Sequence, residues 1–456
     1  MGNPSGHLAY TAAERITIIG SCMLGFALDL YDVLILPFLM PAIQHSLNLS
    51  LTQIASITSI TLIGSVIGGA AFGVTGDRLG RKTALQLTLL LFALGSIASA
   101  FAWNYTSLAS LRLLTGIGLG GEWGAGMVLF NEAWNPKRRG LGSAFIQGSA
   151  VLASAGASIV AIWALGHFAA DRGWRVGLLT GSAPLALIIV IRFWMPESKA
   201  WLRHDQDRRA GRLPDLGLAA RMPLAGMFRP GLRRISFIAL GWMAAYMFCY
   251  YGVIVFMPTL MLKTLHTPAD IVRTTSVIVS VAGGCSYIAM GWLNDRHGRR
   301  MGTLVPAALW IASLLGLYFL GNVHYDMNLF AWPIFWLFIL FGMGNTSLGV
   351  VGTWLSELYP IEVRSTAVSS IYMAGRAAGS LAPVGVPAFA AAFGGGDIIV
   401  GFYLCLPAAV LFIFFSCILP ETRRGGRATA VAATSDDIDA PGAVAMRPGA
   451  STVAQH

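Results

Sequence analysis

Long apolar segments dominate this chain and limit the folds open to it. Twelve of them are long enough to cross a membrane as helices, since about 20 apolar residues span about 30 Å of hydrocarbon. The expected spans are 16–43, 51–75, 84–103, 106–130, 141–167, 175–195, 234–261, 271–293, 303–321, 330–354, 365–392 and 398–419. Helices satisfy their own backbone hydrogen bonds in lipid, so the fold class predicted is an all-α membrane protein with twelve transmembrane helices.

Composition and charge placement are typical of a membrane protein. Only 11% of the 456 residues are charged, against about 25% in soluble proteins. The net charge of +10 does not indicate a nucleic-acid partner, because the Lys and Arg residues lie in loops between spans. The five cysteines lie inside spans without the spacing of metal ligands, so we expect no metal site and no cofactor.

The loops differ in basic residues, which predicts their side of the membrane. Loops around residues 78–82, 137–139, 203–221 and 296–300 are rich in Lys and Arg, whereas 45–50 and 104–106 are short and poor in them. Basic loops stay in the cytoplasm. With an even number of spans, both termini are expected there, in a multi-pass protein of the cell inner membrane.

Three short patterns in the first half of the chain recur in the second half at nearly one offset. The pairs are Gly76–Lys82 with Asn294–Arg300, Glu132 and Arg139 with Glu357 and Arg364, and Pro196–Ser198 with Pro420–Thr422. Such internal repeats are typical of secondary transporters. We therefore expect two pseudo-symmetric six-helix bundles around a central cavity. A monomer is expected as well. The expected parts are a first bundle at 1–195, a cytoplasmic linker at 196–233, a second bundle at 234–420 and a disordered cytoplasmic tail at 421–456.

Five ionisable residues lie deep in the spans, where each costs about 2.5–3.5 kcal/mol on insertion scales. They are Asp29, Asp32, Arg112, Glu122 and Arg376. No histidine lies equally deep. A chain that accepts this cost repeatedly is expected to use these charges.

The three deep acids are the candidates for proton coupling. Asp29 and Asp32 are three residues apart and share a helix face near the membrane midplane. Two such carboxylates in a low dielectric do not both ionise easily, so at least one is expected to bind a proton. A neutral helix-packing pair is the alternative. Glu122 lies in the glycine-rich run 118–126, where it has either a proton-coupling role or a place at a close helix contact.

The two deep arginines are candidates for binding an anion. Arg376 has no acid among the spans of its own half, so its partner is a substrate anion or an acid of the other half. Arg112 has either a substrate role or a fixed pair with Asp29 or Asp32. Polar residues that could line the same cavity are Tyr246, Tyr250, Tyr251, Asn345, Thr346 and Gln147, although the tyrosine spacing also fits simple packing.

The repeated charged loop is predicted to act as a conformational latch. Charges at helix ends can pair with a neighbouring helix terminus in one state and release it in another. The latch candidates are Asp77, Arg78 and Arg81 with Glu132, and Asp295, Arg296 and Arg299 with Glu357. The alternative to a latch is that these loop charges serve only to set the orientation of the chain in the membrane.

These motifs resemble a known group of transporters. Gly73–Lys82 matches the G-x-x-x-D-R-x-G-R-[RK] signature of the major facilitator superfamily. The Asp29-Leu-Tyr-Asp32 segment resembles the paired aspartates of the aromatic acid:proton and sialate/monocarboxylate:proton symporters. Gly120–Gly124 is similar to carboxylate and metabolite symporters. The resemblance implies the two-bundle fold of that superfamily.

The function expected is proton-coupled uptake of a small organic carboxylate by alternating access. Asp29 and Asp32 would take the proton, and Arg376, with Arg112 as a further candidate, would hold the anion. Aromatic and aliphatic acids both fit. Two alternatives are polyspecific efflux by proton antiport, which would be indifferent to Arg376, and a sugar porter. No enzyme is expected, because the loops are shorter than a domain of about 50 residues.

Overall fold

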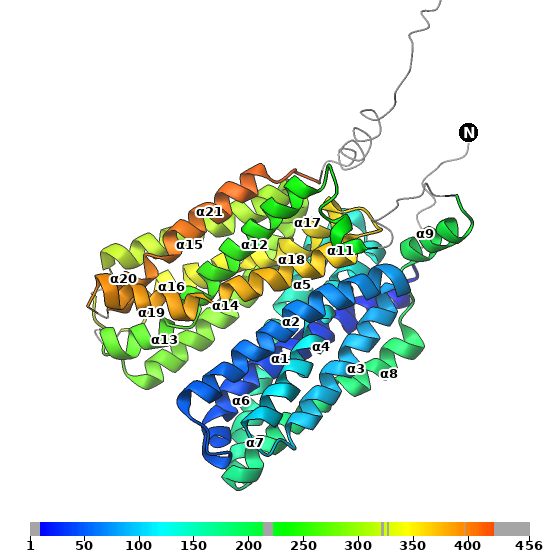
Figure 1. Cartoon of the computed structure of the whole chain (residues 1–456). Coiled ribbons are helices and arrows are strands. Elements are labelled where there is room, and N and C mark those ends of the chain that lie inside the picture. The colour runs from blue at the N-terminus through cyan, green and yellow to red at the C-terminus, as the bar shows by residue number, and fades with distance from the viewer. Residues whose placement is uncertain (1–9, 213–221, 321–322, 326–327, 396, 424–456) are drawn as a thin grey trace, which may run out of the picture.

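The computed structural model describes residues 10–212, 222–320, 323–325, 328–395 and 397–423, and within them the backbone is helical or irregular with no strand. Two bundles of helices lie side by side, with α1 to α8 in one and α12 to α21 in the other (Figure 1). The predicted disordered tail falls mainly on residues 424–456, and the middle of the predicted linker on 213–221. Both lie outside the described residues.

The first bundle follows the chain without interruption. Its helices are α1 (Ala12–Ser46), α2 (Leu51–Leu79), α3 (Arg81–Ser99), α4 (Tyr105–Ala133), α5 (Arg139–Gly148), α6 (Ala150–His167), α7 (Ala170–Leu179) and α8 (Pro184–Trp194). The segment after it contains α9 (Lys199–Arg209) and the short α11 (Pro223–Gly226).

The second bundle repeats this plan. Its elements are α12 (Arg233–Ile254), α13 (Met257–Thr259), α14 (Ala269–His297), α15 (Arg299–Leu320), α16 (Pro333–Gly344), α17 (Leu348–Leu358), α18 (Arg364–Gly379), α19 (Ala382–Phe393), α20 (Ile398–Phe402) and α21 (Cys405–Ile418).

Eleven helical segments among the described residues are long and apolar enough to cross a membrane. The remaining predicted span, 365–392, corresponds to α18 and α19, which are separated at Ser380 and Leu381. α18 is more polar than the other spans because it packs against α2, α4 and α12 inside the protein. Its composition reflects that burial.

Several spans break near their middle, which places polar residues inside the bundles. Single-turn 3₁₀ segments at Thr180–Ser182 and Asn345–Ser347 separate α7 from α8 and α16 from α17. Irregular backbone at membrane depth is tolerated where protein surrounds it. Asn345 and Thr346 therefore lie at a break inside the second bundle.

The glycine-rich run of α4 brings two backbones into contact. A Cβ at Gly120 would lie 2.0 Å from the carbonyl oxygen of Ser65 on α2, and one at Gly116 would lie 2.1 Å from that of Thr61. Small residues allow such close helix packing in membranes. This contact holds α4, and with it Arg112 and Glu122, at a fixed place in the first bundle.

The two bundles meet through matching helix pairs. α18 packs against α2 and α14 packs against α5, and α4 contacts both α17 and α18. α2 and α18 lie along the junction in the view of Figure 1. We call the end of the bundles that carries Gly80, Gly298 and α9 the loop end.

Candidate substrate and proton site

Asp29 and Asp32 are directed at different arginines, although they share one helix face. Both lie on α1 and are at most 1% exposed. Asp32 faces Arg112 of the same bundle, whereas Asp29 faces Arg376 of the other bundle. The spacing on α1 suggests that Asp29 and Asp32 interact with each other, whereas in the structure each belongs to a different ion pair.

The Asp32–Arg112 pair is tight and fully hydrogen-bonded on the acid side. Arg112 Nη1 donates to Asp32 Oδ2 at 2.9 Å, and Ser96 Oγ donates to Oδ1 at 2.7 Å. Arg112 Nε also donates to Ser99 Oγ at 3.0 Å. Of the two arrangements left open for Arg112, the structure has the pair with Asp32.

The Asp29–Arg376 pair is loose. Arg376 Nη1 lies 3.6 Å from Asp29 Oδ2, which is too far for a good hydrogen bond. The two carboxylate oxygens of Asp29 and the Nη1 atom of Arg376 are all buried. None of these three atoms has a hydrogen-bond partner in the structure. Buried polar atoms normally have such partners. The junction between the bundles therefore contains a buried charge pair whose facing atoms make no hydrogen bond.

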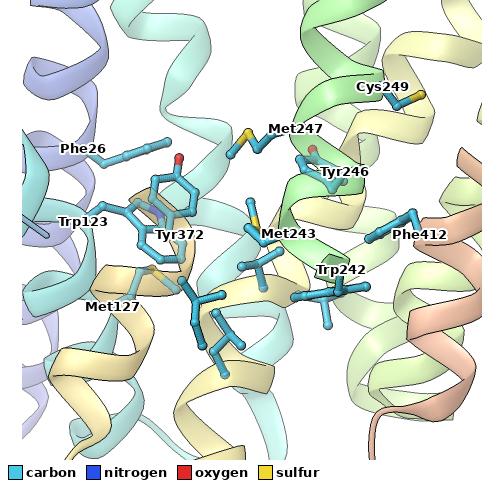
Figure 2. Close-up of a cluster of buried hydrophobic side chains, with 14 of the residues drawn as sticks. Phe26, Trp123, Met127, Trp242, Met243, Tyr246, Met247, Cys249, Tyr372 and Phe412 are labelled. Carbon is cyan, nitrogen blue, oxygen red and sulfur yellow. The ribbon is translucent and has the colours of Figure 1, made fainter. Parts of the chain in front are cut away.

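Aromatic rings surround the loose pair. The Tyr251 hydroxyl lies beside the Arg376 guanidinium, and the Tyr372 ring centre is 6.0 Å from the Arg376 guanidinium carbon. Tyr372 stacks on Trp123 of the other bundle, with ring centres 3.7 Å apart and planes at 14° (Figure 2). The stack joins α4 to α18 next to the buried charges.

Gln147 is also used at the junction. Its Oε1 accepts from Trp123 Nε1 at 3.1 Å, and its Nε2 donates to the carbonyl of Leu348 in the other bundle at 3.3 Å. Gln147 therefore holds Trp123 in its stacked position and connects the two bundles.

The other predicted cavity residues form an aromatic group inside the second bundle. The Tyr246 hydroxyl donates to Asn345, reaching Oδ1 at 2.5 Å, and its ring stacks on Trp310 at 5.0 Å. Tyr250 lies parallel to Tyr246 at 6.4 Å. Thr346 is buried, and its hydroxyl donates to the carbonyl of Met343. The Tyr246 and Thr346 hydroxyls are thus engaged within their own bundle.

Glu122 faces α1. It is 1% exposed, and its Oε2 has no hydrogen-bond partner. Its carboxyl group approaches Gly25, where a Cβ would lie 2.2 Å from Oε1. The absence of a side chain at Gly25 makes room for this carboxyl.

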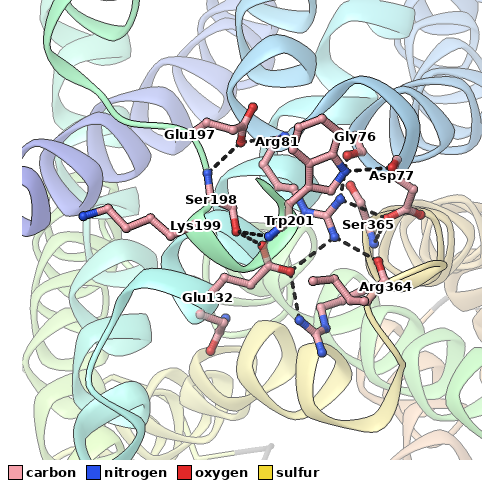
Figure 3. Close-up of polar contacts among 12 residues, drawn as sticks. Gly76, Asp77, Arg81, Glu132, Glu197, Ser198, Lys199, Trp201, Arg364 and Ser365 are labelled. Carbon is pink, nitrogen blue, oxygen red and sulfur yellow. Dashed lines mark hydrogen bonds and ion pairs between the residues drawn. The ribbon is translucent and has the colours of Figure 1, made fainter. Parts of the chain in front are cut away.

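Asp77 connects the two bundles at the loop end. Its oxygens accept from the N–H groups of Ser365 and Thr366 at 3.0 and 2.9 Å, and from the Thr366 hydroxyl at 2.7 Å. These N–H groups belong to the first turn of α18, so an acid of the first bundle caps a helix of the second. Figure 3 shows Asp77 beside Ser365.

Glu132 lies between two arginines in the same region. Arg81 Nε donates to it at 3.2 Å and Arg364 Nη1 at 2.8 Å, the latter from the other bundle (Figure 3). The Ser198 hydroxyl donates to Glu132 at 2.5 Å. This acid therefore binds both bundles and the start of the linker.

The second copy of the motif makes the equivalent contacts in the opposite direction, from the second bundle to the first. Asp295 accepts from the N–H groups of Gly140 and Leu141 at 2.7 and 2.9 Å, which caps α5 of the first bundle. Glu357 pairs with Arg299 at 2.7 Å and with Arg139 at 3.5 Å.

Two further latch candidates lie at the edge of this network. Arg78 is exposed. Arg296 lies over the Trp292 ring at 5.1 Å, a cation–π contact within α14. The central latch contacts described above are made by the other six candidates.

Sequence reasoning missed several site residues. Ser96, Ser99, Tyr372 and Thr366 carry no signal of their own, because each gains its role from a distant partner. Glu197 had a signal in the repeated Pro-Glu-Ser segment. Its carboxylate accepts from the N–H groups of Arg81 and Lys82 and so caps α3, as Glu421 caps α15. Burial raises the pKa of Glu197, and its backbone donors lower it.

The fold and the junction define a class of protein, a multi-pass membrane transporter built from two repeated bundles. A profile of the Major Facilitator Superfamily matches residues 22–284 and 243–441. The chain belongs to this superfamily, which confirms the predicted family, its fold and the expectation that the protein is not an enzyme.

Curated relatives cover most of the chain. The probable 4-methylmuconolactone transporter of Cupriavidus pinatubonensis is 29% identical over 411 residues, covering 88% of this chain and 90% of the relative. The niacin transporter NiaP of Acinetobacter baylyi is 28% identical over 402 residues, covering 84% and 87%. In fold, the chain is similar to the proton:xylose symporter XylE bound to 6-bromo-6-deoxy-D-glucose, with a TM-score of 0.71 at 21% identity over 91% of this chain and 97% of that one.

Proposed function

We propose that this protein is a proton-coupled symporter that carries a small organic carboxylate into the cell. The observation that carries the proposal is the loose Asp29–Arg376 pair between the bundles. A guanidinium offers two parallel N–H donors to a carboxylate, and here Nη1 has no hydrogen-bond partner. A substrate carboxylate can supply the hydrogen bond that Asp29 does not.

The names of the relatives support an acid as the substrate. Niacin is a pyridine carboxylic acid, and the relative named for it covers most of the chain. Arg376 is the proposed anion site, because Arg112 already forms an ion pair with Asp32. Tyr251 beside the guanidinium and Tyr250 on the same helix are proposed to contact the rest of the substrate.

Proton coupling follows from charge balance at the junction. When a substrate anion takes Arg376, Asp29 becomes a buried carboxylate without a cation, and a proton neutralises it most readily. Asp32 remains compensated by Arg112, and Glu122 is the third acid within the site. One proton therefore accompanies each monovalent anion.

The loop-end contacts are proposed to be the latch that alternating access needs. Asp77 and Asp295 each cap a helix of the opposite bundle, so the bundles are joined at this end and must separate here for a substrate to leave. The basic loops favour a cytoplasmic position for this end. The structure then represents the state closed toward the cytoplasm.

Asp77→Asn is expected to slow transport without weakening substrate binding at equilibrium. The amide cannot accept all three hydrogen bonds as well as the carboxylate, so the closed state loses stability relative to the open one. Tracer uptake, equilibrium binding and the inward/outward population, from spin-label distances, would be compared with those of Asp171→Asn, an exposed acid of α7. Loss of binding without a population change would contradict the latch assignment.

The substrate class can be tested by a thermal-shift screen of the purified protein. Benzoate, nicotinate, cis,cis-muconate and gluconate would each be compared with the corresponding neutral amide. Binding to the native state raises the melting temperature by mass action, so at least one acid should stabilise the protein while its amide does not. Equal shifts from acids and amides, or shifts from neutral and cationic drugs alone, would argue against a carboxylate substrate.

A further inference from the structure

Three buried acids and two buried arginines lie in the first bundle and at its junction with the second, so one acid is left without a cation. Asp32 pairs with Arg112 and Asp29 with Arg376. Within the described part of the chain, Glu122 forms no ion pair, and its Oε2 has no hydrogen-bond partner. An isolated buried carboxylate is strongly disfavoured in its charged form. Of the three acids, Glu122 is therefore the one whose charged form has no counter-charge in this structure.

The position of Glu122 is built into α1. A Cβ at Gly25 would lie 2.2 Å from Glu122 Oε1 and 3.2 Å from its carboxyl carbon, so the carboxyl occupies a notch that only glycine leaves open. Gly25 lies four residues before Asp29, on the same face of α1 and about 6 Å along the helix axis. The notch holds the Glu122 carboxyl about one helical turn from Asp29.

The groups around Glu122 leave Asp29 as the proton acceptor. The titratable groups that face it are Asp29 and the Cys22 thiol, both on α1. The thiol donates to the carbonyl of Gly126 at 3.2 Å and is a poor base. From α18, Arg376 faces Asp29. Asp29 is thus the nearby group that can change from a compensated anion to an uncompensated one.

We propose that Glu122 is the proton reservoir that neutralises Asp29 when the substrate carboxylate takes Arg376. The O–H bond of the Glu122 carboxyl breaks, an O–H bond forms on Asp29, and Glu122 then regains a proton from the outer solution. On release of the substrate to the cytoplasm, Asp29 loses its proton and returns to Arg376. The net result is one anion and one proton moved inward. This inference rests on the proposed binding of a carboxylate at Arg376.

Glu122→Gln separates the proton from the shape of the side chain. Glutamine is neutral and fits the notch, but it cannot deliver a proton. The variant should bind the acid with little change in affinity, while the initial rate of uptake driven by an inward pH gradient falls by about 100-fold, the range typical of a lost proton donor. The effect would therefore appear in the maximal rate and not in the half-saturating concentration.

Gly25→Ala tests the same point without changing a titratable group. The added methyl group would collide with the Glu122 carboxyl and move it from its present position against α1, so gradient-driven uptake should fall here too. Gly20→Ala, on the same helix, is the matched control, because a Cβ at Gly20 would have no neighbouring atom within 4 Å outside the adjacent backbone of α1. It should transport like the wild type.

The measurement is uptake of labelled nicotinate or benzoate by the full chain in proteoliposomes, with binding to the same preparations as the check on folding. Failure of the wild type to take up either acid, or any acid of the screen, would overturn the proposed function. Wild-type uptake with full rates in both Glu122→Gln and Gly25→Ala would overturn the proton reservoir alone. If Glu122→Gln does not fold, the comparison of Gly25→Ala with Gly20→Ala decides the question.

Discussion

Uptake driven by an inward pH gradient should be abolished in the Asp29→Asn/Asp32→Asn double variant. The single variants are expected to fail for different reasons. Asp29→Asn removes the acid that takes the proton when the substrate occupies Arg376. It breaks no hydrogen bond, because neither oxygen of Asp29 has a hydrogen-bond partner. Exchange of labelled substrate across the membrane, which needs no net proton movement, should survive in this variant.

Asp32→Asn should instead reduce the stability of the protein. It leaves Arg112 buried without its counter-charge, and breaking a buried ion pair in this way costs about 3–5 kcal/mol. Thermal unfolding in detergent would show this loss for Asp32→Asn and a smaller loss for Asp29→Asn, because the 3.6 Å contact of Asp29 with Arg376 contains no hydrogen bond. Asp171→Asn, an exposed acid at the start of α7, serves as the control for both. Full gradient-driven uptake by the double variant would show that neither aspartate carries the proton.

The amino-acid pattern predicts the membrane spans and the charged loops of this fold better than it predicts the contacts between them. Apolar length places most spans, and the repeat of Asp77 as Asp295 predicts two equivalent loops. The pattern does not show that each acid caps a helix of the opposite bundle, because Asp77 and Thr366 are 289 positions apart. That contact depends on how the two bundles dock against each other.

The buried charges illustrate the same division. Their depth marks Asp29, Glu122 and Arg376 as unusual from hydropathy alone, since charge in a span is costly. Spacing on α1 suggests that Asp29 and Asp32 act on each other, whereas the structure gives each its own arginine. Residue spacing shows only which side chains share a face of α1. The partners of Asp29 and Asp32 depend on how α18 and α4 pack against that face. The Trp123–Tyr372 stack is invisible to sequence reasoning for this reason.

Arg376→Ala should weaken binding of the substrate acid by about 10- to 150-fold, which corresponds to the roughly 1.5–3 kcal/mol of a charge-assisted hydrogen bond. Arg376→Lys should lie between the wild type and Arg376→Ala, because a lysine keeps the charge but loses the two-pronged geometry of the guanidinium. Arg273→Ala, an exposed arginine on α14, should bind normally. Binding of a neutral amide should be similar in all four proteins.

The most direct test of the account is calorimetric binding of one acid from the screen and its neutral amide to the wild type and to Arg376→Ala. The wild type should prefer the acid strongly, and the variant should lose most of that preference while its affinity for the amide stays nearly constant. If Arg376→Ala keeps the full preference for the acid, the anion is held elsewhere. Arg112 would then be the next residue to vary, and the exchange of Asp29 for substrate at Arg376 would be refuted.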